Sequence, residues 1–335
     1  MTQVNETAYP GDESAFQGWT VQYRHELLVH CYRILGSLDD AEDALQETWL
    51  RAWRRLGSLK ERAALRAWLY KIATNVSLDM LDHRKARALP MILYPAADPD
   101  EVLPDPISDP IWLDPLPDTL LDGLPANPEA RYEARESITL AFLAVLQKLP
   151  PRQRAILLLR DVLGWKTQEV AELLEVTSVA VNSTLQRARE TMKREYHKPG
   201  VPVLVRSENA ETANLLSRYV QAWEAADSAS LISLLRDDAA LTMPPFPAWY
   251  RGRAAIQRFL DQFLFTQAAP GFFRLAATRA NGCPTFAVYQ RDNMGVYRPA
   301  ALQILTIADS RIAQIDDFLT FDNRLFTRFS LPLSG

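Results

Sequence analysis

A short run of outward-facing side chains could read DNA bases through hydrogen bonds. In residues 168–189, QEVAELLEVTSVAVNSTLQRAR, apolar residues recur every three or four positions on both sides of a short turn. This spacing predicts two amphipathic helices. Once the apolar stripes are buried, the second helix presents a small, mostly polar face suited to a major groove. Its residues are Ser178, Val179, Asn182, Ser183, Gln186, Arg187 and Arg189.

The elements that hold this face are predicted to form a helix-turn-helix. Thr177 is the expected N-cap of the second helix, because its hydroxyl can accept from a free backbone N–H. Base edges would be met by Ser178, Asn182 and Gln186, and phosphates by arginine and lysine. The alternative is an ordinary helical hairpin with a solvated basic face. The stripe residues are Val170, Ala171, Leu174, Val181, Leu185 and Ala188, and the phosphate-binding candidates are Arg187, Arg189, Lys193 and Arg194.

A second stretch is suited to an unpaired DNA strand. Residues 66–87, RAWLYKIATNVSLDMLDHRKAR, interleave aromatic, basic and amide side chains. Aromatic rings stack on exposed bases, and Arg or Lys neutralises phosphate. Trp68 and Leu69 could instead belong to a core, and for Trp68 burial is favoured over base stacking.

A helix predicted over residues 40–56 has one buried and one polar face. Its buried positions, spaced by three and four, are Ala41, Leu45, Trp49, Ala52 and Leu56. Asp43, Gln46, Glu47 and Arg54 are left outside. These are either solvated helix charges or a binding surface.

The three blocks together resemble the extracytoplasmic-function sigma factors of bacterial RNA polymerase. The resemblance covers about residues 17–87 and 131–196, in the family's order. It implies that Asp43, Gln46 and Glu47 grip a coiled coil of the polymerase's largest subunit, and that the second helix of the helix-turn-helix reads the minus-35 element. The residues implied at the minus-10 element are Arg66, Lys71, Asn75, Asp79, Arg84 and Lys85.

Residues 149–165, LPPRQRAILLLRDVLGW, match the helix that supports the family's promoter-reading domain. The expected scaffold positions are Ile156, Leu157, Leu159 and Val162. One departure stands at the turn, where Glu175 replaces the family's usual glycine. A non-glycine residue with positive φ costs about 1 kcal/mol, so slightly altered docking is expected, without loss of function.

Charge and proline divide the chain into segments. The net charge is −4, yet residues 17–87 hold 12 Lys and Arg against 9 Asp and Glu, and residues 131–198 hold 12 against 8. Residues 88–130 hold 9 acids, no base and 10 of the 22 prolines, which predicts a semi-extended linker. Its apolar segment 112–122 is expected to dock, either on its own domain, on the C-terminal domain or on polymerase.

Residues 199–335 fall outside a minimal sigma factor. Amphipathic helices are predicted around Leu215–Trp223 and Ile256–Phe263, followed by strands at 286–292, 301–309 and 311–322. Helices followed by a strand meander indicate an α+β cone, which resembles the SnoaL-like, polyketide-cyclase-type fold.

Catalysis by this cone is not favoured. It has no histidine or lysine, and its acid–base candidates are Asp316, Asp317, Asp322, Tyr250 and Tyr289. Four further side chains could line a ligand pocket, or could serve as packing or as a dock for the linker, and the latter is preferred. These are Met243, Phe246, Trp249 and Tyr250.

These observations combine into one expectation: two all-α domains, the second a helix-turn-helix, joined by a Pro-rich acidic linker and followed by an α+β cone. The expected segments are a flexible 1–16, a region 2 domain at 17–87, the linker at 88–130, a region 4 domain at 131–198 and the cone at 199–335. The implied partners are core RNA polymerase and promoter DNA, and the cone is expected to regulate in cis by contacting the sigma domains and the linker. The alternative is a helix-turn-helix regulator with a ligand-sensing or vestigial enzyme domain.

Several classes of site and location are not expected. No run of eighteen apolar residues and no basic-then-apolar leader is present, so neither a membrane span nor export is predicted, and a cytoplasmic location is. Cys31 and Cys283 alone cannot build a disulfide framework or a multi-cysteine zinc site. Both are expected to be buried, and no cofactor, metal site or catalytic residue is assigned.

Overall fold

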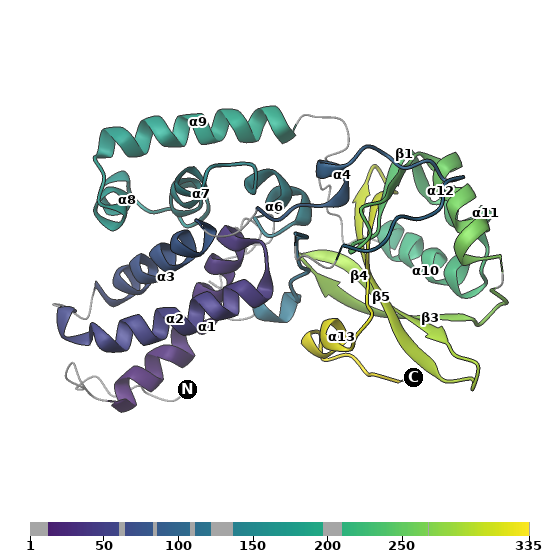
Figure 1. Cartoon of the computed structure of the whole chain (residues 1–335), viewed down its shortest axis with the longest axis horizontal. Coiled ribbons are helices and arrows are strands. Elements are labelled where there is room, and N and C mark those ends of the chain that lie inside the picture. The colour runs from purple at the N-terminus through teal and green to yellow at the C-terminus, as the bar shows by residue number, and fades with distance from the viewer. Residues whose placement is uncertain are drawn as a thin grey trace. The chain divides into compact units, whose positions relative to one another are not determined.

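A computed structural model describes residues 13–59, 64–82, 86–107, 111–121, 137–196, 210–266 and 268–334. The chain divides into two compact units, each built from two stretches of sequence. We call Met1–Arg87 with Leu113–His197 the helical unit, and Ala88–Trp112 with Lys198–Gly335 the C-terminal unit (Figure 1). The proline-rich stretch is thus shared between both units.

The first half of the helical unit is a three-helix module, α1 (Glu13–Leu35), α2 (Leu38–Arg54) and α3 (Leu65–Leu81). A two-residue connection, Gly36 and Ser37, separates α1 from α2, and Gly36 has a φ of +73°. Ser37 then caps α2 by accepting from the backbone N–H of Asp40 at 3.3 Å. A 3₁₀ turn follows at Leu56–Ser58, and Leu56 is buried.

The second half comprises α6 (Leu140–Leu146), α7 (Pro151–Leu157), α8 (Thr167–Leu174) and α9 (Ser178–Tyr196). Thr139 caps α6, and Pro151 occupies the first turn of α7, where no N–H is needed. A π-helical turn at Leu158–Val162 extends α7, and a short 3₁₀ turn lies at Asp118–Leu121.

Arg154 joins the two halves of the helical unit. Its guanidinium is 1% exposed and donates to the backbone oxygens of Ile34, Gln147 and Leu149 and to the Gln147 side chain. Burial lowers the pKa of Arg154 to about 10, so the group stays charged at neutral pH. One cation therefore satisfies the carbonyls at the ends of α1 and α6, which would otherwise be buried without donors.

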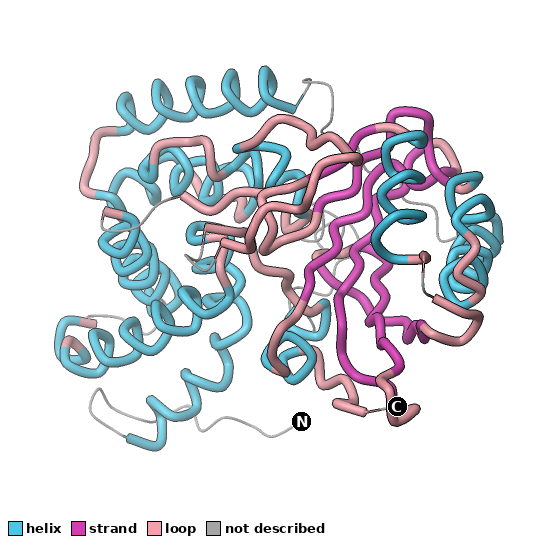
Figure 2. The backbone as a smooth tube through the Cα atoms, turned by 45° about the vertical axis from the view of Figure 1, so that its right-hand side comes forward, coloured by secondary structure: helices cyan, strands magenta, loops and turns pink. Residues whose placement is uncertain are grey.

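The C-terminal unit is built around one six-stranded sheet, seen as the magenta tube in Figure 2. Its strands, in the spatial order β2-β1-β6-β5-β4-β3, are β1 (Leu235–Thr242), β2 (Trp249–Arg251), β3 (Phe273–Ala280), β4 (Cys283–Arg291), β5 (Tyr297–Ala308) and β6 (Arg311–Leu319). Its helices are α4 (Pro90–Leu93), α10 (Ala210–Glu224), α11 (Ser228–Ser233), α12 (Arg253–Phe259), extended by a π turn at Leu260–Leu264, and α13 (Arg324–Arg328).

Aromatic side chains hold α10 against the sheet. The Tyr219 ring stacks on Phe286 at 5.5 Å between centroids, and Trp223 meets Phe265 and Phe273 edge-on at 5.3 and 5.4 Å. Such offset and edge-to-face pairs add to the burial of apolar area.

The helical sigma-type modules and the α+β domain agree with the predicted fold class, with one change in topology. The expected meander describes β3 to β6, whereas β1 lies between α11 and α12 in sequence and pairs parallel to β6. The sheet is therefore mixed: α12 leads the chain from β2 to β3 at the opposite edge, and the meander that follows ends with β6 beside β1.

Most predicted stripe positions are buried, with three differences. In α8 the third buried residue is Leu173, and Leu174 is only half-buried. Trp49 and Val162 are also half-buried. Cys31 and Cys283 are both buried, as expected.

The part of the chain that the structure describes contains neither a membrane-spanning helix nor a cluster of metal-ion ligands. None of its helices combines the length and apolar character needed to cross a bilayer. Within the same residues, no group of three or more His, Cys, Asp or Glu is placed to hold a metal ion.

Candidate nucleic-acid interface

The helix-turn-helix forms with the predicted cap and the predicted outer face. Thr177 Oγ1 accepts from the Ala180 N–H at 3.1 Å, so α9 begins directly after it. Val181, Leu185 and Ala188 are buried beneath α9. The opposite face is exposed and consists of the seven predicted residues Ser178, Val179, Asn182, Ser183, Gln186, Arg187 and Arg189.

The polar groups of this face contact both α9 itself and the segment that precedes the helix-turn-helix. Gln186 donates to Glu190 at 3.0 Å, and Arg187 donates to the Thr184 hydroxyl at 3.2 Å. Arg189 forms a two-point ion pair with Asp161, at 2.8 and 2.7 Å. Exposed pairs of this kind are worth about 0–1 kcal/mol, so a phosphate could replace the carboxylate at little cost.

Glu175 adopts the left-handed conformation expected of the turn, with φ 56° and ψ 45°. Its carboxylate accepts from Lys71 Nζ of α3 at 2.9 Å. The ammonium of Lys71 lowers the pKa of Glu175. The residue that departs from the family's glycine thus forms an ion pair between the turn and α3.

The candidate minus-10 side chains spread along α3. Arg66 is exposed and donates twice to Glu26 of α1, at 3.0 and 2.8 Å. Lys71 and Asn75 are half-buried, and Asp79 is exposed. Trp68 is half-buried and Leu69 fully buried. Arg84 and Lys85 lie outside the described residues.

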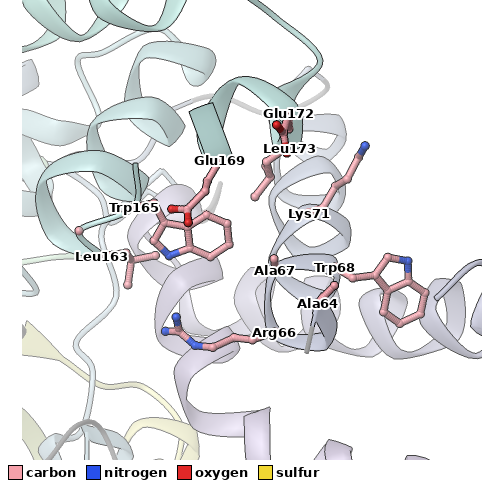
Figure 3. Close-up of a pocket in the computed structure, with 11 residues that line it drawn as sticks. Ala64, Arg66, Ala67, Trp68, Lys71, Leu163, Trp165, Glu169, Glu172 and Leu173 are labelled. Atoms are coloured by element: carbon pink, nitrogen blue, oxygen red, sulfur yellow. The ribbon is translucent and has the colours of Figure 1, made fainter. Parts of the chain in front are cut away.

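A cavity of about 530 Å³ lies between α3 and the start of the helix-turn-helix (Figure 3). Arg66, Lys71 and Trp68 line it from α3, and Trp165 and Glu169 line it from the other side. The Trp165 ring also packs on Tyr70 of α3 at 5.3 Å. The two modules of the helical unit therefore contact each other through residues that include Lys71, a candidate DNA ligand, and Arg66 lines the cavity beside this contact.

The candidate polymerase-binding surface lies on α2. Asp43 and Gln46 are exposed, whereas Glu47 is half-buried and accepts from Arg51 Nε at 2.7 Å. Arg51 Nη1 also donates to Asp79 Oδ2 of α3 at 2.8 Å. Sequence reasoning missed Arg51, although its position four residues after Glu47 is typical of a helical ion pair.

Sequence reasoning also missed two exposed apolar side chains on α2. Leu50 is 53% exposed and Trp53 is 45% exposed. Neither residue occupies a position of the buried apolar stripe of α2. This mismatch with the helical spacing could have identified them as exposed. They add apolar area beside the predicted polar contacts, as in many protein interfaces.

The proline-rich linker docks at two places. Its later part lies on the helical unit, where Asp114 accepts from the Leu38 N–H at 3.0 Å and its own backbone contacts Gly36 and Tyr32. A side chain at Gly36 would meet Leu113 at 2.7 Å, so the approach requires glycine.

The earlier part of the linker lies on the C-terminal unit. Trp249 Nε1 donates to the Tyr94 carbonyl at 2.9 Å, and the Ala97 N–H donates to the Trp249 carbonyl at 2.8 Å. The Ile107 N–H donates to Pro245 O at 2.9 Å. Trp249, one of the four side chains expected to serve as packing or as a dock for the linker, thus hydrogen-bonds to the linker at two points.

The other candidate side chains of the cone do not converge on one centre. Met243 and Tyr250 belong to the core, and Phe246 packs edge-on against Phe321. The acid–base candidates are also dispersed. Asp316 accepts from Thr242, Tyr289 donates to the Pro332 carbonyl, and Asp322 is exposed.

Comparison with known proteins connects these surfaces to a family. The Sigma-70 region 2 model matches residues 20–87, the Sigma-70 region 4 model matches residues 139–192, and the SnoaL-like domain model matches residues 216–315. The chain is 44% identical over 326 residues to the ECF RNA polymerase sigma factor SigG of Mycobacterium tuberculosis, covering 96% of this chain and 86% of that protein. The chain belongs to the extracytoplasmic-function (ECF) sigma factor family.

Two further likenesses extend over nearly the whole ECF sigma factor. The chain is 28% identical over 314 residues to the ECF RNA polymerase sigma factor SigJ of Mycobacterium tuberculosis, covering 89% of this chain and 90% of that protein. The crystal structure of Mycobacterium tuberculosis SigJ matches with a TM-score of 0.59 at 23% identity, covering 95% of this chain and 99% of that chain. The fold, including the SnoaL-like domain, is thus shared.

Proposed function

We propose that this ECF sigma factor binds core RNA polymerase through α2, opens and reads the minus-10 element with α3, and reads the minus-35 element with α9. The observation that carries the proposal is the exposed polar face of α9, presented by a buried apolar stripe in a chain that belongs to the sigma factor family. Its place of action would be the cytoplasm, where the polymerase and the promoter are.

The proposed contacts divide into specific and positioning ones. Ser178, Asn182 and Gln186 carry hydroxyl and amide groups that can pair with base edges, while Arg187 and Arg189 carry the charge for phosphates. On α3, Arg66 and Lys71 hold carboxylates that promoter phosphates would replace. Asp43, Gln46 and Glu47 remain the proposed polymerase contacts.

Promoter binding requires the two modules of the helical unit to separate. The minus-10 and minus-35 elements are about 25 base pairs apart, or roughly 85 Å at about 3.4 Å per base pair. In the helical unit, however, Lys71 of α3 touches Glu175 beside α9. We therefore propose that core polymerase opens this unit, with the contacts of Arg154 and Gln147 to the end of α1 broken in the process.

Fluorescence energy transfer can follow this opening in the full chain. Dyes placed at Asp79→Cys on α3 and Glu190→Cys on α9 label exposed positions, because both native cysteines are buried. Addition of core polymerase is expected to lower the transfer efficiency sharply. Unchanged transfer in a complex that still forms would contradict the opening step.

The C-terminal unit is proposed to regulate the sigma modules in cis and not to catalyse a reaction. The support is the linker, whose residues Tyr94, Ala97 and Ile107 are held by this unit while Asp114 is held by the helical unit. A change in the C-terminal unit can thus alter the linker between the two promoter-reading modules. Deletion of residues 206–335 should change promoter-specific transcription, and unchanged activity and affinity would oppose regulation.

A helix-turn-helix regulator that acts without polymerase is the second candidate. It would bind duplex promoter by itself through α9. Gel-shift assays with and without core enzyme distinguish the two, because the sigma factor is expected to give a specific shift only with core enzyme.

A further inference from the structure

The C-terminal unit contains a cavity of about 340 Å³ that no proposed sigma contact uses. Its walls come from α10, β3, β4, β5 and the end of β6, and include Trp223, Phe273, Val288 and Leu319. The volume lies within the range of about 300–1,000 Å³ typical of small-molecule sites. Mostly apolar walls with a few polar groups are also typical of such sites.

One buried carboxyl group among the lining residues has an oxygen without a hydrogen-bond partner. Asp317 lines the cavity, is 4% exposed, and its Oδ1 has no hydrogen-bond partner. The carboxyl group of Asp317 ends a chain of hydrogen bonds. The Tyr219 hydroxyl donates to Gln303 Oε1 at 2.7 Å, and the Gln303 amide hydrogen-bonds to Asp317. A buried polar atom without a partner is costly, and a ligand that paired with Oδ1 would remove that cost.

The adjacent residue provides an internal contrast. Asp316 is equally buried, but its Oδ1 accepts from the Thr242 hydroxyl at 2.8 Å and from Gln314 at 2.7 Å. It does not line the cavity. Neighbouring residues of a strand point to opposite faces, so two adjacent carboxyl groups differ in access to the cavity and in hydrogen bonding.

The charges around the cavity restrict the ligand. Arg291 and Arg298 stand with Asp292 among the lining residues, giving this part of the wall an excess of positive charge that disfavours an ammonium ligand. Asp317 in the interior disfavours an anion. A neutral hydroxyl fits both, because it donates to a carboxylate and accepts from a carboxylic acid. Burial raises the pKa of Asp317 to about 7, so both forms of the group are populated near neutral pH.

The cavity is also connected to the docked linker through backbone hydrogen bonds. The N–H of Leu319, a lining residue, donates to Pro244 O at 2.8 Å. The next carbonyl, Pro245 O, accepts from Ile107 of the linker at 2.9 Å. Phe321, at the same wall, packs edge-on against Phe246 at 6.2 Å. A movement of Leu319 would therefore be transmitted to the linker residue Ile107 through Pro244 and Pro245.

We propose that this cavity binds a neutral apolar small molecule through one hydroxyl group on Asp317 Oδ1, and that its occupancy adjusts the linker through Pro244 and Pro245. The binding part stands independently of transcription. The second part rests on the proposed cis regulation of the sigma modules.

Binding is tested on the full chain with 2-naphthol and with naphthalene, which lacks only the hydroxyl. Titration by fluorescence or equilibrium dialysis should give at least tenfold tighter binding of 2-naphthol. Asp317→Leu should reduce that ratio to about one, whereas Asp316→Asn should keep it. The proposal is overturned if neither probe binds saturably, or if Asp317→Leu keeps the preference.

A second variant guards against loss of folding in Asp317→Leu. Ala301 is buried in the cavity wall, so Ala301→Leu should fill the space and weaken both probes at least tenfold. Circular dichroism checks that this variant is folded. Unchanged binding of 2-naphthol to folded Ala301→Leu would place the probe elsewhere and overturn the proposal.

The link to the linker is measured by hydrogen exchange of residues 94–107. Saturating 2-naphthol should change their exchange rates at least threefold in the wild type and leave them unchanged in Asp317→Leu. Binding without any change at 94–107 would overturn the transmission step alone. Failure of the chain to support transcription with core polymerase would instead overturn the proposed function and leave the binding result intact.

Discussion

The helical unit and the C-terminal unit use buried polar groups differently. In the helical unit, Arg154 donates to the carbonyls that end two helices, and Asp40 pairs with Arg87 at 2.6 Å, both nearly inaccessible. In the C-terminal unit, Asp317 lines a cavity and has an oxygen without a hydrogen-bond partner. The interior of the helical unit supports the proposed DNA-binding surface, whereas the interior of the C-terminal unit contains the proposed ligand-binding cavity.

Removal of the Arg154 guanidinium tests the structural role of buried charge in the helical unit. Arg154→Met leaves several carbonyl oxygens without a donor and should lower the free energy of unfolding of this unit by about 3 kcal/mol. Arg152→Met, at an exposed neighbouring position, is the matched control. Urea unfolding followed by thiol labelling separates the units, because Cys31 lies in one and Cys283 in the other. A loss below 1 kcal/mol, or an equal loss at Cys283, would refute this role.

The two units should also respond to pH with opposite signs. Burial, aided by the charge of Arg33, lowers the pKa of His30 to about 3 from 6.5. Between those values the unfolded chain binds the proton and the folded one does not, so the stability of the helical unit rises with pH and levels off above about 6.5. His30→Gln should remove this rise, and His25→Gln, half-exposed on the same helix, should keep it.

In the C-terminal unit, the buried carboxyl group of Asp317 should give the opposite dependence of stability on pH. Burial raises the pKa of Asp317 to about 7 from 3.8, so the folded state binds the proton more tightly across that interval. Stability at Cys283 should therefore fall as pH rises from about 4 to 7, by a few kcal/mol at most. Asp317→Asn should reduce this fall without abolishing it, because burial also raises the pKa of Asp316, to about 6, while the exposed Asp322→Asn should leave the fall unchanged. The same slope in Asp317→Asn would rule out this assignment.

On the surface of the helical unit, two neighbouring side chains of α9 should separate specificity from affinity. Gln186→Ala removes a group that can pair with a base, and should lower the preference for the cognate minus-35 element by about 1–3 kcal/mol. Arg187→Ala should weaken cognate and scrambled promoters alike and reduce the salt dependence of binding. The measurement is promoter binding by the polymerase complex at several salt concentrations. Equal behaviour of the two variants would contradict the division.

The smallest effect is expected at the turn of the helix-turn-helix. Glu175→Ala and Glu175→Gly both lose the ion pair with Lys71, but only alanine keeps the unfavourable positive φ. The glycine variant should therefore be more stable than the alanine variant by about 1 kcal/mol. Equal urea midpoints at Cys31 would show that the backbone conformation costs nothing.

Local spacing predicted the buried and exposed helix faces of the helical unit better than the strand arrangement of the C-terminal unit. The outer face of α9 follows from helical periodicity around Val181, Leu185 and Ala188, and the Thr177 cap is a local interaction. The contacts of Lys71 with Glu175 and of Arg154 with Ile34 span more than 100 residues, so no local pattern contains them.

In the C-terminal unit the sequence identified Asp316 and Asp317 as candidates but could not separate them. Their difference depends on which face of β6 carries the cavity and on partners such as Gln303 and Thr242 from other strands. The parallel pairing of β1 with β6 was missed for the same reason. Strand order is set by long-range packing, which a single sequence does not display.

Run-off transcription with purified core RNA polymerase measures whether the chain initiates RNA synthesis at promoters. Genomic promoter fragments transcribed with and without the full chain are expected to give discrete transcripts only when the chain is present, and Asp43→Arg on α2 should abolish them while leaving the chain folded. The account is contradicted if the folded chain neither associates with core polymerase nor starts RNA synthesis from any fragment.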